Sequence, residues 1–512
     1  MRTRFLAFTI TALLIAMAAA ASSLEAQVVR IQGVLLDEMS GAPLAGASVS
    51  IEGTAAVTAT NREGRFLLTH VGDSAVTVVV SMIGYKSVRQ ALSPTADLRN
   101  LRFTLAPDPF ESEAIVVTGI ASSRARSLAE VSVARVSASE LAAQQLYTSL
   151  DQLVAGKIAG VQMRPAAGYV GGGWRFYVRG GGGLNGDGQP LIFVDGVRIN
   201  NSNLDLLWNG GQGYANTLSL TPSEIENIEV LKGPAAAAMY GTNASNGVVL
   251  ITTKSGAARA MAEGGIAMNY RFSYGQNQMP FDYDARYYKN ADLYNNLLRD
   301  GLIREHTIDL SGGSGIFRYF LGFENKFEEG VAPSNYQTRN AARVNVDAAP
   351  NDRVNLSISA GYSENDLERP HSDDAVLSPH WSTIMVDVPW KSYDSVAVMS
   401  TTAPARNTRT TGSAQLNWKP IQGLTLFGNV GIDHSYHRQD EFYPPEYRYW
   451  MGYGGRKRVA EWVNTQRTYD FKASYSYQPM SDLSVTSVVG TQLFDRESKD
   501  TGMEKRQFAT GM

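Results

Sequence analysis

The second half of the chain alternates apolar and polar residues. In residues 354–362, Val, Leu, Ile, Ala and Tyr fall on one face of the pattern, while Asn, Ser and Gly fall on the other. Residues 268–274 and 471–477 repeat this period of two. Such alternation, over segments of about ten residues, predicts strands of an outer-membrane wall with lipid on one side and a polar lumen on the other. A soluble antiparallel sheet would alternate similarly, so the pattern alone does not decide between them.

The connections between these segments favour the membrane wall. We predict strands near residues 265–275, 303–311, 315–326, 339–348, 353–364, 410–418, 424–436, 467–477 and 483–495. The linkers alternate between long or intermediate ones and tight ones, and the tight ones are at residues 312–314, 349–352, 419–423 and 478–482. Outer-membrane barrels have short turns at one end and longer loops at the other. The order of the linkers obeys that rule throughout.

The first half predicts two smaller units. Residues 28–105 contain short apolar strands separated by turn signals, which predicts a β-sandwich of roughly 80 residues. Residues 150–254 contain short apolar strands closed by glycine-bearing turns, with brief helical stretches between them. That second pattern predicts a small α+β domain.

Composition narrows the function classes. The chain has no cysteine, which excludes disulfides, thiolate metal sites and a Cys nucleophile, and its formal net charge of −3 argues against a nucleic-acid binder. His70 is the only histidine before His306, so a zinc site of the usual ligand count is not expected in the sandwich. Since no catalytic constellation appears with a plausible spacing, we expect neither an enzyme nor a metal or other cofactor.

The N-terminus predicts a secretory signal peptide. Arg2 and Arg4 precede an apolar run from Phe5 to about Ala20, and small residues follow it before Gln27. The run is short for a membrane-spanning helix.

Several motifs in residues 150–254 resemble the plug of TonB-dependent outer-membrane transporters, in particular the SusC/RagA-like branch. They are Leu153-Val-Ala-Gly-Lys-Ile-Ala-Gly-Val161, Phe176-Tyr-Val-Arg-Gly180, Pro190-Leu-Ile-Phe-Val-Asp-Gly196, Ile225-Glu-Asn-Ile-Glu-Val-Leu-Lys-Gly-Pro234 and Asn246-Gly-Val-Val-Leu-Ile-Thr-Thr-Lys254. The sandwich resembles the carboxypeptidase-regulatory-like domain, through Gly41-Ala-Pro-Leu-Ala-Gly-Ala-Ser-Val49, Gly64-Arg-Phe66 and Ser81-Met-Ile-Gly-Tyr85.

The resemblance implies a mainly β fold with five parts. These are a signal peptide (1–26), a sandwich (27–106), a linker (107–127), a plug (128–256) and the first part of a transmembrane antiparallel β-barrel (257–512). Plugged transporters have roughly 22 strands, whereas about nine are visible here. We therefore expect a truncated record or a natural fragment.

The linker contains a candidate contact for an energy-coupling partner. Glu113, Ala114, Ile115, Val116, Val117, Thr118 and Gly119 form a β-prone segment before a polar run. An exposed strand of this kind suggests that something pairs with it, and the resemblance implies the TonB box. The alternative is that this segment is the first strand of the plug and stays packed within the plug permanently.

Two further sets of residues are candidate sites. By resemblance, the plug motif and latch residues are Arg179, Gly180, Asp195, Gly196, Lys232 and Gly233. We expect the basic residues Arg179 and Lys232 to meet wall carboxylates, since a buried charge must be paired; solvation in the lumen is the alternative.

The two longest predicted loops contain candidate contacts for substrate or a lid protein, namely Trp381, Trp390, Tyr447 and Trp450. Packing within the loops or at the membrane boundary explains these aromatic residues equally well.

The implied function is active import across the outer membrane, with the N-terminal domain and plug facing the periplasm. The expected partners are the TonB-ExbB-ExbD complex, a SusD-like surface lipoprotein, outer-membrane lipid and an oligosaccharide or peptide substrate. Alternatives are uptake of an iron chelate or vitamin, a cell-surface β-domain adhesion protein, and a nonfunctional truncated transporter.

Overall fold

The structure is a computed structural model in which part of the chain is described. The described residues are 28–38, 41–44, 46–51, 57–71, 76–82, 85, 88–92, 98–106, 133–138, 141, 150, 154–165, 168–178, 188–202, 215–216, 220–232, 236–237, 240–256, 266–314, 316–351, 353–369, 383–384, 395, 399–445, 454–480 and 483–507. They divide between two compact units, Met1–Ala114 and Ile115–Met512.

The first unit is the predicted β-sandwich. One sheet has the order β4-β1-β7 and the other the order β3-β2-β5-β6. The strands are β1 (Val28–Asp37), β2 (Ser48–Ile51), β3 (Val57–Ala59), β4 (Arg65–Val71), β5 (Val76–Ser81), β6 (Val88–Leu92) and β7 (Leu101–Leu105). Alternate residues of the strands face inward, so Ile31, Val49 and Phe103 share one buried core between the sheets.

Replacing Phe103 at the centre of this core with a smaller residue is expected to lower the stability of the sandwich. Phe103 is 2% exposed and its ring lies 5.8 Å from that of Phe66. Phe103→Ala is expected to lower the stability of the sandwich by about 3–5 kcal/mol, because it removes buried area and leaves a cavity. Denaturant unfolding followed by proteolysis of this unit in the full chain measures the change. Leu67→Ala, at a half-exposed position on β4, is the matched control, and an equal effect there would contradict the packing argument.

The second unit begins with the α+β part, which we call the plug. Its main sheet has the order β12-β11-β14-β13-β8, and β9 pairs with β10 in a second sheet. The strands are β8 (Val133–Ser137), β9 (Val161–Pro165), β10 (Trp174–Val178), β11 (Leu191–Val194), β12 (Val197–Ile199), β13 (Ile225–Leu231) and β14 (Val248–Thr253). Two short 3₁₀ helices, η3 (Pro222–Glu224) and η4 (Thr242–Ala244), precede β13 and β14.

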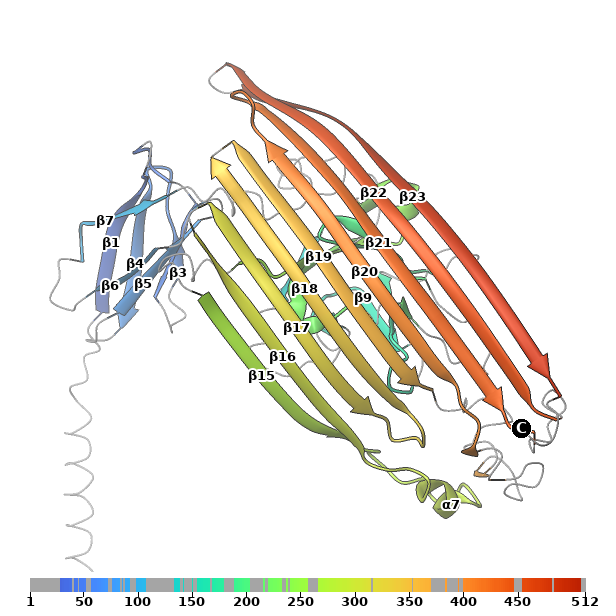
Figure 1. The fold of residues 1–512 in the computed structure, drawn as a ribbon. Coiled ribbons are helices and arrows are strands. Elements are labelled where there is room, and N and C mark those ends of the chain that lie inside the picture. Colours follow the sequence, from blue (N-terminus) through green and yellow to red (C-terminus); the bar gives the residue numbers. More distant parts are fainter. Residues whose placement is uncertain are drawn as a thin grey trace, which may run out of the picture. The chain divides into compact units, whose positions relative to one another are not determined.

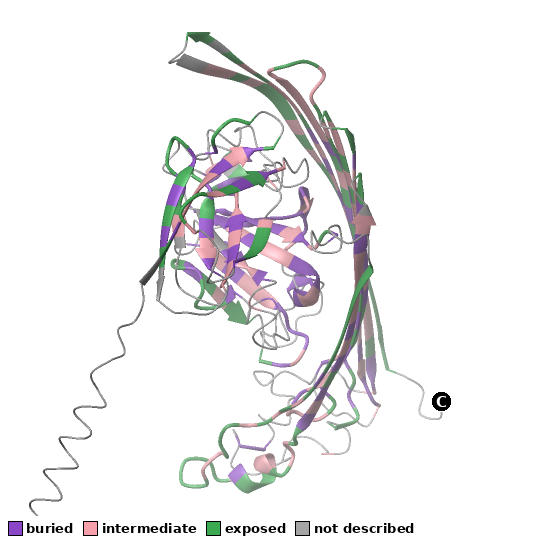
Figure 2. Ribbon diagram, turned by 90° about the vertical axis from the view of Figure 1, so that its left-hand side faces the viewer, coloured by how far each residue is buried: buried purple, intermediate pink, exposed green. Residues whose placement is uncertain are grey.

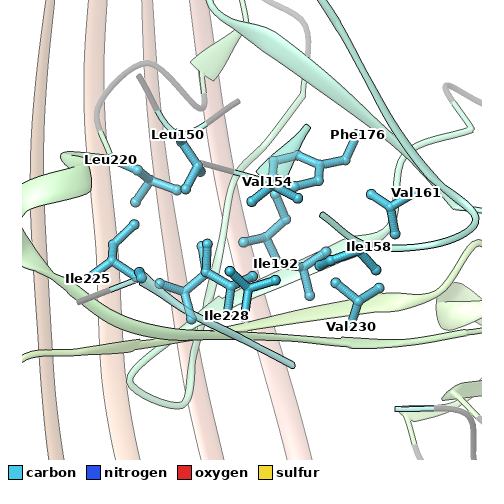
Figure 3. Close-up of a cluster of buried hydrophobic side chains, with 14 of the residues drawn as sticks. Leu150, Val154, Ile158, Val161, Phe176, Ile192, Leu220, Ile225, Ile228 and Val230 are labelled. Carbon is cyan, nitrogen blue, oxygen red and sulfur yellow. The ribbon is translucent and has the colours of Figure 1, made fainter. Parts of the chain in front are cut away.

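An apolar cluster joins the two plug sheets. Phe176 of β10, Ile192 of β11 and Ile228 of β13 are buried together, with Val154 and Ile158 from the segment before β9 (Figure 3). The strands β11 and β14 are buried along nearly their whole length, as expected for parallel neighbours at the centre of a sheet. This core gives the plug a rigid body from which turns project.

The rest of the second unit is a broad antiparallel sheet, which we call the wall. Its strands neighbour one another in sequence order, and Figure 1 shows them side by side. They are β15 (Ile266–Asn277), β16 (Gly301–Ser314), β17 (Phe317–Glu329), β18 (Tyr336–Asn351), β19 (Val354–Glu368), β20 (Pro404–Trp418), β21 (Leu424–Tyr443), β22 (Arg456–Met480) and β23 (Leu483–Arg506).

The two faces of the wall have opposite chemistry. Tyr270, Ile358 and Phe471 are among the large apolar side chains exposed on the outer face, whereas charged and amide side chains such as Arg343 and Asn429 are buried on the inner face. Figure 2 shows the curved sheet edge-on, with the plug on its concave side. An exposed apolar face and a buried polar face are the reverse of a soluble protein and suit contact with lipid. The predicted fold class is confirmed.

The connections follow the predicted alternation, but the strand ends differ. Tight turns join β16 to β17, β18 to β19, β20 to β21 and β22 to β23, while the other connections are longer; one of them carries α7 (Ala291–Asn295). Residues 437–443 and 456–466, which we expected in a loop, belong instead to β21 and β22. Among the described residues, no helix is long and apolar enough to cross a membrane.

Candidate functional site

The tip of one plug hairpin contacts the wall. Val194 pairs with Val197, so Asp195 and Gly196 form a two-residue turn between β11 and β12. Both have positive φ, 46° and 78°, as a type I′ turn requires. Asp-Gly is a favoured sequence for this turn, because glycine and, to a lesser degree, aspartate tolerate the left-handed backbone region. The turn therefore explains both residue types.

The Asp195 carboxylate links the plug to two strands of the wall. Within the plug it accepts hydrogen bonds from the Thr253 amide at 2.9 Å and from the Thr253 hydroxyl at 2.6 Å. From the wall it accepts a hydrogen bond from the Ser359 hydroxyl of β19 at 2.8 Å, and Nη1 of Arg343 on β18 lies 3.5 Å away. The contacts from the plug fix the rotamer, so the carboxylate is oriented before it meets the wall.

The backbone of the same turn meets the next two strands. Nε2 of Gln415 on β20 donates to the Asp195 carbonyl at 2.6 Å, and Nδ2 of Asn429 on β21 donates to the Gly196 carbonyl at 3.0 Å. Gln415 and Asn429 are direct partners in the wall register. Four successive strands, β18 to β21, thus hold one two-residue turn.

A glycine in the wall allows this close approach. Gly431 of β21 faces Val197, the residue after the turn. A Cβ at position 431 would lie 3.2 Å from the Val197 Cβ and would collide with its methyl group. The absent side chain at 431 is therefore needed for the observed contact between β12 and the wall.

Arg343 pairs with a second plug carboxylate. Its Nε donates to Oε2 of Glu224 at 2.8 Å, and Glu224 ends the short helix η3. The Glu224 carbonyl accepts a hydrogen bond from the Lys254 amide, which ties η3 to the end of β14. One wall guanidinium thus lies between two plug carboxylates, and all three groups are largely withdrawn from solvent. Pairing of this kind is what makes buried charge tolerable.

A second guanidinium holds plug backbone groups. Arg409 of β20 forms a bidentate pair with Asp433 of β21, at 2.6 and 2.7 Å, and the two side chains are 2% and 0% exposed. Arg409 also donates to the carbonyls of Asn200 and Asn216, at 3.1 and 3.2 Å. Asp433 accepts a hydrogen bond from the Asn200 amide at 2.8 Å. The pair therefore binds both a donor and acceptors of the plug backbone.

Two further contacts lie away from this turn. Lys254 of the plug pairs with Asp309 of β16 at 3.0 Å. Asn335, which precedes β18, accepts a hydrogen bond from the Val170 amide at 2.9 Å and donates to the Val170 carbonyl at 3.1 Å. The contacts named so far are mainly hydrogen bonds and ion pairs, and Phe494 of β23 adds an apolar contact, with its ring 6.0 Å from that of Phe193 in the plug. Hydrogen-bonding and charged groups can exchange their partners for water when two surfaces separate, whereas separated apolar surfaces cannot.

The predicted site residues are distributed as follows. Asp195 and Gly196 lie against the wall, as described above. Lys232 is buried, and its amine donates to the carbonyl of Ala159, so this contact is made within the plug. Arg179, Gly180, Gly233, the segment Glu113 to Gly119 and the aromatic candidates Trp381, Trp390, Tyr447 and Trp450 lie outside the described residues.

The charged contacts at the Asp195 turn are made by residues that were not among the predicted latch cations. Asp195 and Glu224 are plug acids that meet the wall cation Arg343, whereas Lys254 is a plug cation that meets the wall acid Asp309. Arg343, Arg409 and Asp433 were not predicted. Arg343 and Asp433 are charged residues within predicted transmembrane strands, which was the available signal, whereas Arg409 lies just before the predicted strand 410–418.

Comparison with protein families identifies both N-terminal parts. Residues 125–248 match the TonB-dependent Receptor Plug Domain. Residues 31–117 match the CarboxypepD_reg-like domain. The plug match includes the Asp195 turn and the helix that carries Glu224.

Curated relatives extend the similarity into the wall. The chain is 27% identical over 496 residues to TonB-dependent receptor SusC of Bacteroides thetaiotaomicron, covering 88% of this chain and 46% of the relative. It is 25% identical over 489 residues to TonB-dependent receptor P26 of Formosa agariphila, covering 87% of this chain and 46% of the relative. The chain therefore spans about half the length of these relatives.

Solved structures share the fold. The structure of the RagAB peptide transporter matches with a TM-score of 0.58 and 19% identity, over 74% of this chain and 49% of that one. Four findings point to the same kind of protein. They are the plug match, the regulatory-like sandwich, the similarity to SusC over most of the chain and the fold shared with the RagAB structure. The chain thus carries a TonB-dependent receptor plug and a CarboxypepD_reg-like domain, and over most of its length it is similar to TonB-dependent receptor SusC.

Proposed function

We propose that this chain takes part in TonB-dependent import of a nutrient across the outer membrane. In this proposal the plug blocks the lumen of a barrel of which the wall forms part. Energy from the inner membrane, delivered by the TonB-ExbB-ExbD complex, moves the plug. The substrate then passes from the extracellular side to the periplasm, where the sandwich and plug are exposed.

The polar contact between plug and wall carries the proposal. A permanent seal would be expected to bury apolar side chains, as the plug core does around Phe176 and Ile228. The Asp195 turn is held instead by hydrogen bonds and a shared guanidinium. Such contacts position the plug accurately, yet water can replace each of them during movement.

The partners of the import reaction follow from the family. We assign Glu113 to Gly119 as the segment that adds a strand to the periplasmic coupling protein, a recognition mode that uses backbone hydrogen bonds. We further infer that the cargo is an oligosaccharide or a peptide and that a SusD-like lipoprotein captures it at the surface. Similarity to SusC over most of the chain supports this assignment.

A disulfide between plug and wall tests whether the plug must move. The Cβ of a residue at position 431 would lie 3.2 Å from the Val197 Cβ, close to the separation of about 3.8 Å that is typical of disulfides. In cells that produce the full-length receptor, Val197→Cys with Gly431→Cys is expected to abolish substrate uptake under oxidising conditions and to restore it on reduction. This chain has no other cysteine to compete for the bond.

Each single cysteine variant is the control. Both should transport equally with and without reductant, because neither can form the crosslink alone. Uptake that continues while the disulfide is intact would refute movement of the plug away from this part of the wall. Labelled oligosaccharides and peptides, supplied separately, assign the cargo class in the same assay.

A further inference from the structure

The connection between β15 and β16 carries a group of aromatic side chains at the surface. Phe281, Tyr283, Tyr287, Tyr288 and Tyr294 lie within fourteen residues of one another. Tyr287 is 79% exposed and Phe281 is 58% exposed, and Tyr288 is exposed as well. We call these five residues the aromatic patch. It belongs to the end of the wall that has the longer connections, where Figure 1 shows α7.

The patch is built around Tyr283. The Tyr283 ring makes edge-to-face contacts with Phe281, Tyr288 and Tyr294, at centroid distances of 5.7, 5.6 and 5.2 Å. The Asn295 side chain accepts a hydrogen bond from the Tyr283 amide at 3.0 Å and donates to its carbonyl at 2.9 Å. The exposed rings of Phe281 and Tyr288 are thus packed against Tyr283, so these two side chains have less conformational freedom to lose when a ligand binds.

Other connections anchor the segment. Nδ2 of Asn290 donates to the carbonyl of Thr383 at 2.9 Å, in the connection between β19 and β20. The Arg299 amide donates to the Val331 carbonyl at 3.0 Å, in the connection between β17 and β18. These two hydrogen bonds hold the segment against neighbouring connections, as the support of a preorganised binding surface requires.

The polar groups around the rings are nearly balanced in charge. Residues 281–294 contain three carboxylates and two cations. Arg286 forms a bidentate pair with Asp284, and its guanidinium lies 5.9 Å from the centroid of the Tyr287 ring. Hydrogen bonds from Arg286 hold the pKa of the Asp284 carboxyl below its usual range, so it stays ionised and can accept hydrogen bonds. The patch therefore combines flat apolar faces with donors and acceptors but little net charge.

We propose that the aromatic patch binds a neutral oligosaccharide. A sugar ring has an apolar C–H face that fits an aromatic ring, and its hydroxyl groups fit the carboxylate and guanidinium beside Tyr287. Peptides have charged termini and side chains, for which this balanced surface offers no strong preference. The inference rests on the proposed function, since it selects one of the two cargo classes assigned to the receptor.

Direct binding to the purified full-length receptor tests the patch without requiring transport. The probes are neutral hexasaccharides of glucose, xylose, mannose and fructose, with a tryptic casein digest as the peptide probe. At least one hexasaccharide is expected to bind, and Tyr287→Ala is expected to weaken it on the order of tenfold, from the loss of one stacking surface. Phe281→Ala should act similarly. Leu293→Ala removes an exposed apolar side chain of α7 that is not aromatic, and should leave binding unchanged.

The outcomes separate this inference from the proposed function. Failure of every hexasaccharide to bind would overturn it, and so would binding that Tyr287→Ala and Phe281→Ala leave intact. If casein peptides bind the receptor and both variants abolish that binding, the patch is a peptide site. Loss of association with a surface lipoprotein, with sugar binding unchanged, would make it a protein contact. The disulfide experiment reports on plug movement and stays informative in each case.

Discussion

Replacing Arg343 with alanine is expected to loosen the plug and to speed amide exchange at Thr253 on the order of a hundredfold or more. Arg343 is the wall cation shared by Asp195 and Glu224. Removing one partner of a buried pair leaves uncompensated charge and costs about 3–5 kcal/mol. The Thr253 amide donates to the Asp195 carboxylate, so its exchange rate reports directly on the turn.

Arg406→Ala is the matched control for this measurement. Arg406 pairs with Asp366 at 2.6 Å on neighbouring wall strands, but its side chain is half-exposed. An exposed pair contributes about 0–1 kcal/mol, so Thr253 exchange should hardly change. Combining Arg343→Met with Asp195→Asn and Glu224→Gln removes all three charges together and should recover much of the protection. Equal exchange in Arg343→Ala and in the unchanged receptor would show that the guanidinium does not hold the plug.

Asp433→Ala should disturb both the wall and the plug. It removes the carboxylate that forms the bidentate pair with Arg409, and it also removes the acceptor of the Asn200 amide. We expect the stability of the full-length receptor to urea in detergent to fall by about 3–5 kcal/mol, because removing one partner of a buried ion pair is strongly destabilising. Amide exchange at Asn200 should rise in parallel.

Two variants calibrate that result. Asp433→Asn keeps a hydrogen-bond acceptor at the same place and should lose less stability than Asp433→Ala. Asp495→Ala breaks an exposed pair with Arg467 and should cost no more than about 1 kcal/mol. If Asp433→Ala weakens the urea resistance as little as Asp495→Ala does, the Arg409 pair is not an anchor.

The wall was predictable because its strands carry a repeating signal. Residues such as Leu356, Ile358 and Tyr362 alternate with serine and asparagine, and the structure exposes exactly that apolar set on the outer face. The strand ends were less predictable. Residues 456–466 of β22 mix arginine, lysine, glutamate and asparagine with the adjacent apolar pairs Val459-Ala460 and Trp462-Val463, so the strict alternation is lost before the hydrogen-bonded ladder ends.

The candidate site was predictable only in part. Asp195-Gly196 is visible as a turn motif, but its partners Ser359, Gln415 and Asn429 are 164 to 233 residues away and depend on how the sheet is rolled around the plug. The aromatic patch had a local signal, since residues 281–288 contain four aromatic side chains. Aromatic residues also occur in the two longest predicted loops, so aromatic content alone does not distinguish the connection between β15 and β16.

The contact of four wall strands with the Asp195 turn also affects how the turn responds to force. Side chains from four adjacent strands converge on two residues, so a pull that draws the turn straight away from the wall loads these contacts together and not one after another. Bonds loaded in parallel share the tension and break as one unit, whereas bonds loaded in series would unzip at a much lower force. The turn is therefore built to resist small random pulls and to release abruptly above a threshold.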